Sequence, residues 1–144
     1  MVEGYRELKY KSQQEFNEFS EKYMFYAFNK KQFADGMKEF GLEISDTHKI
    51  NQVAPGAFVR KEKVRALYDM SQIYADKIKE AMKDEEFAYD AFKTELANHE
   101  YCITYDASDA LAVLGFNLEE IRDNEILSKA YLKARKDYLA EVEI

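Results

Sequence analysis

The chain has 144 residues, a formal net charge of −7, 47% hydrophobic and 15% aromatic residues, and one cysteine. This length is typical of a domain that buries enough apolar surface to fold without a metal or a disulfide, and a single cysteine excludes a disulfide within the chain. The hydrophobic content excludes wholesale disorder, and no apolar run approaches the roughly 20 residues that a membrane-spanning helix needs.

These properties predict a single domain spanning residues 1–144 that works in the cytoplasm of its host cell and does not contact a membrane. Residues 1–10 lack the apolar core of a signal peptide, and the lone Cys102 suits a reducing compartment. One proline and five glycines leave no flexible linker along the chain.

The first 28 residues predict a helix followed by a short strand. Ser12 and Glu15 have the spacing of a capping box. Leu8 extends the same apolar face upstream, so a helix start near Tyr5 is the alternative. Residues 24–28 are short, apolar and aromatic, which favours a strand. The helix is expected to turn inward Phe16, Phe19 and Tyr23.

A second helix and a β-hairpin are predicted next. Asn29 and Gln32 repeat the capping-box spacing, and Gly41 stands where a helix would end in the left-handed conformation. Segments 49–53 and 57–61 flank a Pro-Gly pair that fits a type II turn. Because a two-stranded hairpin alone is marginal, we expect the preceding strand to complete a three-stranded antiparallel sheet.

The second half is predicted to be mostly helical. Asp84, Asp106 and Asn117 stand where helix N-caps are expected, and Gly115 ends one helix. The β-formers of residues 101–105 predict a further short strand. The fold class is therefore α+β, mostly helical, with one small antiparallel sheet of about three strands in the N-terminal half. The residues expected to face inward are Val64, Leu67, Tyr68, Ser71, Tyr74, Ile78, Met82, Phe87, Ala91, Phe92, Leu96, Leu111, Leu114, Leu127, Tyr131, Ala134 and Tyr138.

Residues 84–125 carry twelve acidic side chains against two basic ones, Lys93 and Arg122, a net charge of −10. Helix caps and first turns account for about half of these acids, because negative charge there complements the helix dipole. They do not account for the missing cations. An unbalanced acidic surface attracts a basic partner and repels nucleic acid. We therefore predict a partner-binding surface formed by Asp84, Glu85, Glu86, Asp90, Glu119, Glu120 and Asp123.

A basic cluster is the alternative binding site. It lies where the predicted hairpin meets the long helix that follows, with Phe58 nearby, and this combination suits contact with a phosphate backbone. Glu62 interrupts it, and such clusters are more often a solvated face of the protein. The alternative nucleic-acid-binding residues are Lys49, Arg60, Lys61, Lys63 and Arg65.

Metal binding and catalysis receive little support from the sequence. His99 follows Glu95 by four residues, but a zinc site needs three or four ligands and His48 is remote in sequence. Cys102, His99 and Asp106 have the residue types of a thiol nucleophile, a base and an orienting acid, yet nothing requires them to converge. We expect no metal, no cofactor and no catalytic residue, with His99 at a helix C-terminus.

Two segments carry a resemblance to known proteins. Residues 25–42 read FYAFNKKQFADGMKEFGL, and residues 95–106 read ELANHEYCITYD. Together they resemble a family of small proteins carried by phages and mobile elements of gut bacteria. The resemblance brings no activity with it. It implies a genomic setting in which small inhibitors of host defence are common.

Charge and resemblance together predict a non-catalytic, anti-CRISPR-like inhibitor that presents its acidic surface to a host protein with a basic groove, either a nuclease or a ribonucleoprotein. The alternative is a nucleic-acid-binding accessory protein that uses the basic cluster, and an enzyme is a third reading. Tyrosine-rich helical faces also suit isologous contacts, so a homodimer is an alternative assembly.

Overall fold

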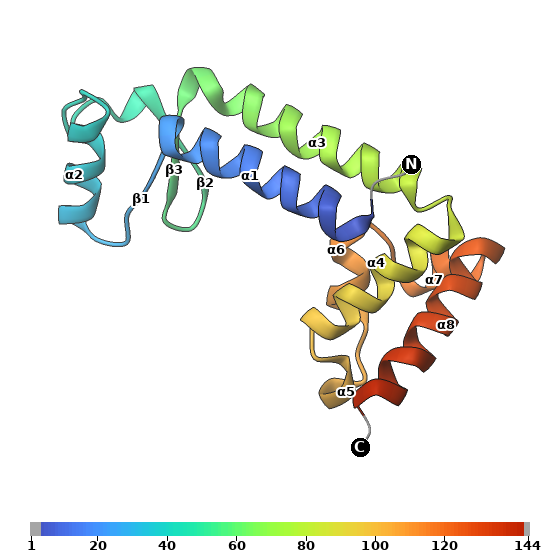
Figure 1. The fold of residues 1–144 in the computed structure, drawn as a ribbon. Coiled ribbons are helices and arrows are strands. Elements are labelled where there is room, and N and C mark those ends of the chain that lie inside the picture. The colour runs from blue at the N-terminus through green and yellow to red at the C-terminus, as the bar shows by residue number, and fades with distance from the viewer. Residues whose placement is uncertain (1–3, 143–144) are drawn as a thin grey trace. The chain divides into compact units, whose positions relative to one another are not determined.

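The computed structural model describes residues 4–142, which contain eight α-helices and three β-strands (Figure 1). The contacts within the chain divide it into two compact units. The sheet unit comprises residues 11–72, and the helical unit combines the residues up to Tyr10 with those from Ile73 onward. The predicted mostly helical α+β fold is confirmed. That residues 1–144 form a single domain stays a prediction.

The sheet unit is built around three antiparallel strands in the order β1-β3-β2, which confirms the predicted sheet. At the predicted turn, Gly56 has a φ of +74°, a conformation that glycine adopts without steric cost. The elements of this unit are part of α1 (Tyr5–Tyr23), β1 (Met24–Tyr26), α2 (Lys30–Glu39), β2 (Ile50–Ala54), β3 (Ala57–Arg60) and part of α3 (Val64–Ala81), with short 3-10 turns at Thr47–Lys49 and Lys61–Lys63.

Both faces of the sheet are covered, because successive residues of a strand point to opposite sides. Met24 packs with Phe19 and Val59 in a cluster that also takes in residues of α3. Phe25, the next residue, packs with Met37 of α2 in a second cluster. A small sheet buried on both sides is stable in a way that an isolated hairpin is not.

Helix α2 begins and ends where the sequence predicts. The Asn29 side chain accepts a hydrogen bond from the Gln32 backbone N–H at 2.8 Å, and Gly41 follows the helix with a φ of +71°. Inside the helix, Gly36 is buried against the ring of Phe25. A Cβ at this position would lie 2.1 Å from the nearest ring carbon, so the close contact between helix and strand depends on glycine.

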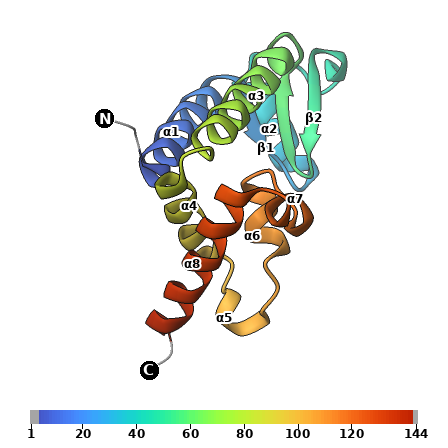
Figure 2. The same cartoon turned by 90° about the vertical axis from the view of Figure 1, so that its right-hand side faces the viewer.

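The helical unit is organised around α8. Helix α4 packs along α8 and against α6, and α7 packs against α8 (Figure 2). The first residues of α1 belong to this core as well, since the Tyr5 ring meets the Phe87 ring edge-on at 6.0 Å. Beyond the last part of α3, the elements are α4 (Glu85–Asn98), α5 (Tyr101–Thr104), α6 (Ser108–Val113), α7 (Leu118–Arg122) and α8 (Glu125–Val142).

Two predicted helix starts in this unit are confirmed. The Asp84 carboxylate accepts from the Phe87 backbone N–H at 2.9 Å, and Asn117 with Glu120 forms a complete capping box. No helix within residues 4–142 is long and apolar enough to cross a membrane. The predicted inward residues that are buried in the helical unit are Ile78, Met82, Phe87, Ala91, Phe92, Leu96, Leu111, Leu114, Leu127, Tyr131, Ala134 and Tyr138.

The predicted strand at residues 101–105 is wrong. These residues form the single turn of α5, whose Tyr101 ring is buried and whose Cys102 backbone N–H donates to the Tyr138 hydroxyl at 3.3 Å. β-propensity depends on a neighbouring strand to pair with. The three strands that the structure describes are paired with one another in the sheet unit, and the Tyr101 side chain packs against Tyr138 of α8 instead.

Three further details differ from the sequence prediction. Ser12 lies inside α1, which begins near the alternative start at Tyr5 because that tyrosine is fully buried. Tyr68 and Ser71 are exposed, since α3 turns Val64 and Leu67 toward the core of the sheet unit and Tyr74 and Ile78 toward that of the helical unit. The N-cap of α6 is Ala107, and the carboxylate of Asp106, one residue earlier, accepts from Ser108 instead.

Candidate functional site

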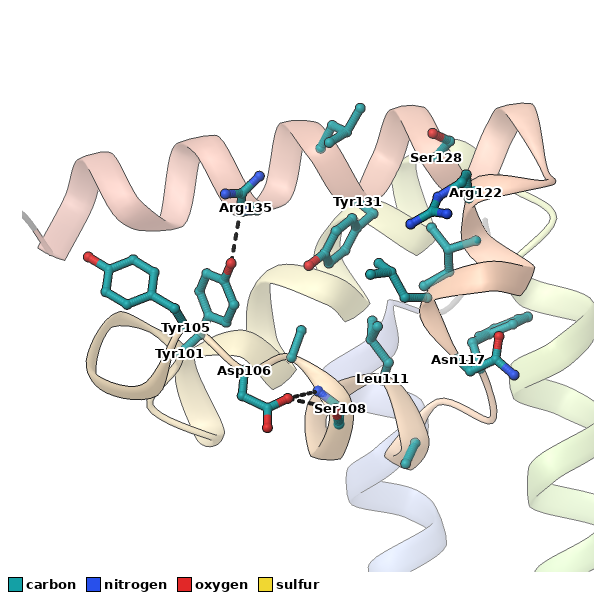
Figure 3. A pocket seen from close by; sticks show the side chains of 16 residues that line it. Tyr101, Tyr105, Asp106, Ser108, Leu111, Asn117, Arg122, Ser128, Tyr131 and Arg135 are labelled. Carbon is teal, nitrogen blue, oxygen red and sulfur yellow. Dashed lines mark hydrogen bonds between the residues drawn. The ribbon is translucent and has the colours of Figure 1, made fainter.

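The helical unit contains a pocket of about 790 Å³ between α5, α6, α7 and α8 (Figure 3). Ligand pockets commonly measure roughly 300–1,000 Å³ and have mostly apolar walls with a few polar groups. This pocket has that character, since buried aliphatic side chains form its floor and two arginines and two buried tyrosines add polar groups. The lining residues that matter most are Tyr101, Leu111, Ile121, Arg122, Tyr131 and Arg135.

An arginine and two tyrosines lie close together in the wall of this pocket. The Arg135 side chain donates from Nε to the hydroxyl oxygen of Tyr101 at 3.0 Å, and Figure 3 shows Tyr131 in the wall between Arg135 and Arg122. Burial raises the pKa of Tyr131, and the neighbouring Tyr101 raises it further. The Tyr131 hydroxyl therefore keeps its proton at neutral pH.

The pocket carries a small positive charge within an acidic part of the chain. Its charged lining residues are Arg122, Arg135 and Asp106. Asp106 already accepts hydrogen bonds from both the backbone N–H and the hydroxyl of Ser108, at 2.9 and 2.6 Å, and these bonds lower its pKa. Among the residues that the structure describes, no carboxylate forms an ion pair with either arginine.

Local backbone geometry positions the tyrosines of α5. Glu100 and Tyr105, which flank this helical turn, both have left-handed conformations with φ of 51° and 55°, which non-glycine residues rarely adopt. The Tyr101 ring is buried, and it meets the ring of the exposed Tyr105 edge-on at 5.7 Å. Strained residues of this kind persist where the surrounding packing holds them, often at functional sites.

Replacing Glu100 with glycine is expected to raise the free energy of unfolding by about 0.5–1 kcal/mol, because glycine adopts the left-handed conformation without the cost that a Cβ imposes. Glu100 is exposed and accepts no side-chain hydrogen bond from a described residue. Urea titration measures the change. Glu100→Ala is the matched control, and equal stability of the two variants would show that backbone strain at this position is negligible.

A buried carboxylate forms a second polar cluster in the helical unit. Glu95 is 1% exposed and accepts hydrogen bonds at Oε1 from the Tyr5 hydroxyl at 3.0 Å, from Lys9 Nζ at 2.6 Å and from Asn98 Nδ2 at 3.0 Å. Its Oε2 has no hydrogen-bond partner within the described residues, with His99 Nδ1 at 3.8 Å. The cluster ties the start of α1 to α4, and we assign it a structural role.

The predicted acidic surface residues lie on two helices. Glu85, Glu86 and Asp90 lie in α4, with Asp84 as its N-cap, and Glu119 and Glu120 lie in α7, with Asp123 as its C-cap. All are exposed apart from the half-buried Asp90. Within residues 4–142 none of the seven pairs with a lysine or arginine. Several also have the helix-terminal roles that the capping explanation predicts.

The basic cluster has mostly local partners in the sheet unit. Arg60 donates to the Phe40 carbonyl oxygen at 2.8 Å and covers the Phe40 ring at 4.3 Å, and Lys63 lies 4.5 Å above the ring of Tyr23. These two cations are held against aromatic rings, which accounts for their position without a phosphate ligand. Local ion pairs hold two more members, Lys49 with Asp46 and Arg65 with Asp69.

The sequence candidates for metal binding and catalysis do not assemble within the described residues. His99 is the C-cap of α4, as predicted, and its Nδ1 lies 2.9 Å from the carbonyl oxygen of Glu95. No hydrogen bond joins Cys102, His99 and Asp106 to one another. Among residues 4–142 no group of three or more histidine, cysteine or acidic side chains could hold a metal ion.

The sequence does not predict the pocket. Its pattern indicates only a core position for Tyr131 and a rare cation of an acidic stretch for Arg122, and it gives Arg135 no role. The available signal was a tyrosine and an arginine four residues apart, Tyr131 and Arg135, which places both on one face of the last helix.

The fold defines a mostly helical α+β protein with one small antiparallel sheet. The chain belongs to DUF7659, a family of unknown function whose model matches residues 4–137. No curated protein matches the chain, and no solved structure does. Because the family description assigns no activity, the phage setting and the anti-defence role stay predictions.

Proposed function

We propose that this is a non-catalytic binding protein that docks through carboxylates of the helical unit to a partner with a basic groove. In the form that the sequence resemblance implies, the partner is a host defence nuclease or ribonucleoprotein, and docking inhibits it in the host cytoplasm. The observation that carries the proposal is that these carboxylates, all exposed apart from the half-buried Asp90, form no ion pair with a lysine or arginine among the described residues.

Uncompensated surface charge acts mainly on association. It steers a partner of opposite sign toward the surface and disfavours partners of the same sign, and salt screens it over a distance of about 10 Å at 0.1 M ionic strength. The last turn of α4 contains no basic residue, and the one lysine of this helix, Lys93, pairs with Glu141 of α8, so the negative charge at the start of α4 is not balanced along the same helix. A basic nucleic-acid channel has the charge that this surface favours.

Two charge-reversal variants test the docking surface. Glu85→Lys with Glu86→Lys alters the α4 group, and Glu119→Lys with Asp123→Lys alters the α7 group. Glu120 stays unchanged because its side chain accepts from the Asn117 backbone N–H. For a partner captured from host lysate and purified, we expect at least one variant to lower the association rate constant about tenfold, with a smaller effect at high salt.

The matched control is Glu15→Lys with Glu18→Lys, which makes the same charge change on exposed residues of the sheet unit. Thermal unfolding of every variant checks that the fold persists, since reversing charge in the first turn of α4 costs roughly 0.3–1 kcal/mol per residue. Equal association rates for wild type and both surface variants would exclude docking through these carboxylates.

The alternative, nucleic-acid binding through Lys49, Arg60, Lys61, Lys63 and Arg65, has weaker support. Four of these cations have partners nearby, as described above, and Lys61 alone adds little affinity for a phosphate backbone, where binding rises with the number of phosphates neutralised. We therefore do not put it forward as a second function.

A further inference from the structure

The pocket between α5, α6, α7 and α8 is a concave space of about 790 Å³ that opens to solvent, and its size falls within the range of roughly 300–1,000 Å³ that is common for ligand pockets. Its rim leaves apolar surface in water, since Tyr105, Leu118 and Leu132 all line it and are 61, 48 and 55% exposed. Exposed apolar side chains that border a concave space are typical of a ligand site.

The positive charge of the residues that line the pocket favours a negatively charged ligand. Arg135 uses its Nε on Tyr101, and its terminal guanidinium nitrogens have no carboxylate partner among the described residues. Arg122 has no ion pair there either, although Glu119 and Asp123 lie within three residues of it in the chain. A guanidinium group offers a planar pair of donors that fits a carboxylate. Asp106 also lines the space, but it accepts its two hydrogen bonds from Ser108 at Oδ1 and forms no ion pair with either arginine among the described residues, so the lining keeps a net positive charge.

The other residues that line the pocket favour a ligand that contains an aromatic ring. Four rings border the space, those of Tyr101, Tyr105, Phe116 and Tyr131. Rings in such walls accommodate another ring edge-on or offset. Leu111 and Ile121 are buried and form the apolar floor of the space. If the aromatic ring of a ligand lies on this floor, the acid group attached to that ring lies among the polar side chains of the lining, namely the two arginines and Tyr131.

We propose that this pocket binds a small aromatic carboxylate, with its acid group held by Arg135 and its ring packed on the floor of the pocket. The site is separate from the acidic residues of the docking surface, since none of these lines it. The proposal therefore does not depend on the proposed function. The protein would join a small-molecule site to a surface for a macromolecular partner.

Titration of the full chain with 3-phenylpropionate, followed by two-dimensional NMR, tests the pocket. We expect binding with a millimolar or tighter dissociation constant, with shift changes centred on α5 and α8. The neutral isostere 3-phenylpropanol has the same ring without the charge and is expected to bind at least tenfold more weakly. Inorganic phosphate is negatively charged but has no apolar group, so we expect it to shift few resonances. Equal binding of the acid and the alcohol, or no saturable binding of the acid, overturns the proposal.

Two variants locate the site. Arg135→Gln is expected to weaken binding of 3-phenylpropionate about tenfold, and Leu132→Asn severalfold. Lys136→Gln removes the same charge from an exposed neighbour on α8 and should leave affinity unchanged. Thermal unfolding identifies any variant that fails to fold. If Arg135→Gln fails to fold, Leu132→Asn still tests whether the ligand binds in this pocket. If Lys136→Gln weakens binding as much as Arg135→Gln does, attraction is nonspecific and the assigned pocket is wrong.

Discussion

Replacing Lys9 with methionine is expected to lower the free energy of unfolding by about 3 kcal/mol. Methionine keeps most of the side-chain length but removes the ammonium group that lies 2.6 Å from Glu95 Oε1. Removing one partner of a buried ion pair costs roughly 3–5 kcal/mol, because the remaining charge stays buried and uncompensated. We take the lower end of that range because the Lys9 side chain is itself 38% exposed and because Tyr5 and Asn98 still donate to the same carboxylate.

Urea titration measures this change, and Lys22→Met on the same helix is the matched control, since Lys22 is exposed. Combining Lys9→Met with Glu95→Leu removes both charges and is expected to recover part of the loss, since apolar replacements of whole buried pairs are often tolerated. If Lys9→Met lowered the free energy of unfolding by less than about 1 kcal/mol, the Lys9–Glu95 pair would be as weak as a typical surface salt bridge. That result would contradict a structural role for the pair.

Replacing Gly36 with alanine is expected to lower the free energy of unfolding by about 1–3 kcal/mol, although alanine is the better helix former by about 1 kcal/mol. The new methyl group would lie 2.1 Å from the ring of Phe25. That ring also stacks on Phe58 at 5.2 Å and meets Phe33 and Phe40 edge-on, so it has little room to move. Relief of the clash requires displacement of α2 from the strand.

Gly41→Ala separates this steric effect from backbone strain. Gly41 has a φ of +71° but no atom within 4 Å of an added Cβ, so its replacement costs only the left-handed conformation, about 1 kcal/mol. Thermal and urea unfolding compare the two variants. If Gly36→Ala left the free energy of unfolding unchanged or raised it, α2 would be able to move away from β1 at no cost in free energy. That result would contradict the tight packing of Gly36 against Phe25.

The sequence predicted the features that depend on neighbouring residues. Asp84 and Asn117 cap helices because their side chains reach backbone donors three residues away, and Gly56 turns the hairpin because it tolerates a positive φ. Such local rules need no knowledge of the rest of the fold. The three-stranded sheet is not local, since Met24 pairs with Val59, and it was predicted from a separate rule, that an isolated hairpin is marginal and needs a further strand.

The sequence did not predict the features that depend on distant contacts. Tyr101 and Arg135 are 34 residues apart and meet only because α5 packs near α8. The burial of Glu95 likewise depends on Tyr5 and Lys9, which precede it by 90 and 86 residues. Charge counting treated Glu95 as one of twelve equivalent acids, although it is buried and paired while most of the others are exposed.

The division of α1 and α3 between the two units has a consequence for any attempt to dissect the protein. A fragment that starts at Ile73 lacks Tyr5 and Lys9, and it therefore exposes the binding side of Glu95 to solvent. No single cut in the sequence releases the helical unit whole. An autonomous version requires residues 4–10 to be rejoined to the later segment by a designed linker, so excision at one boundary yields a piece with an incomplete core.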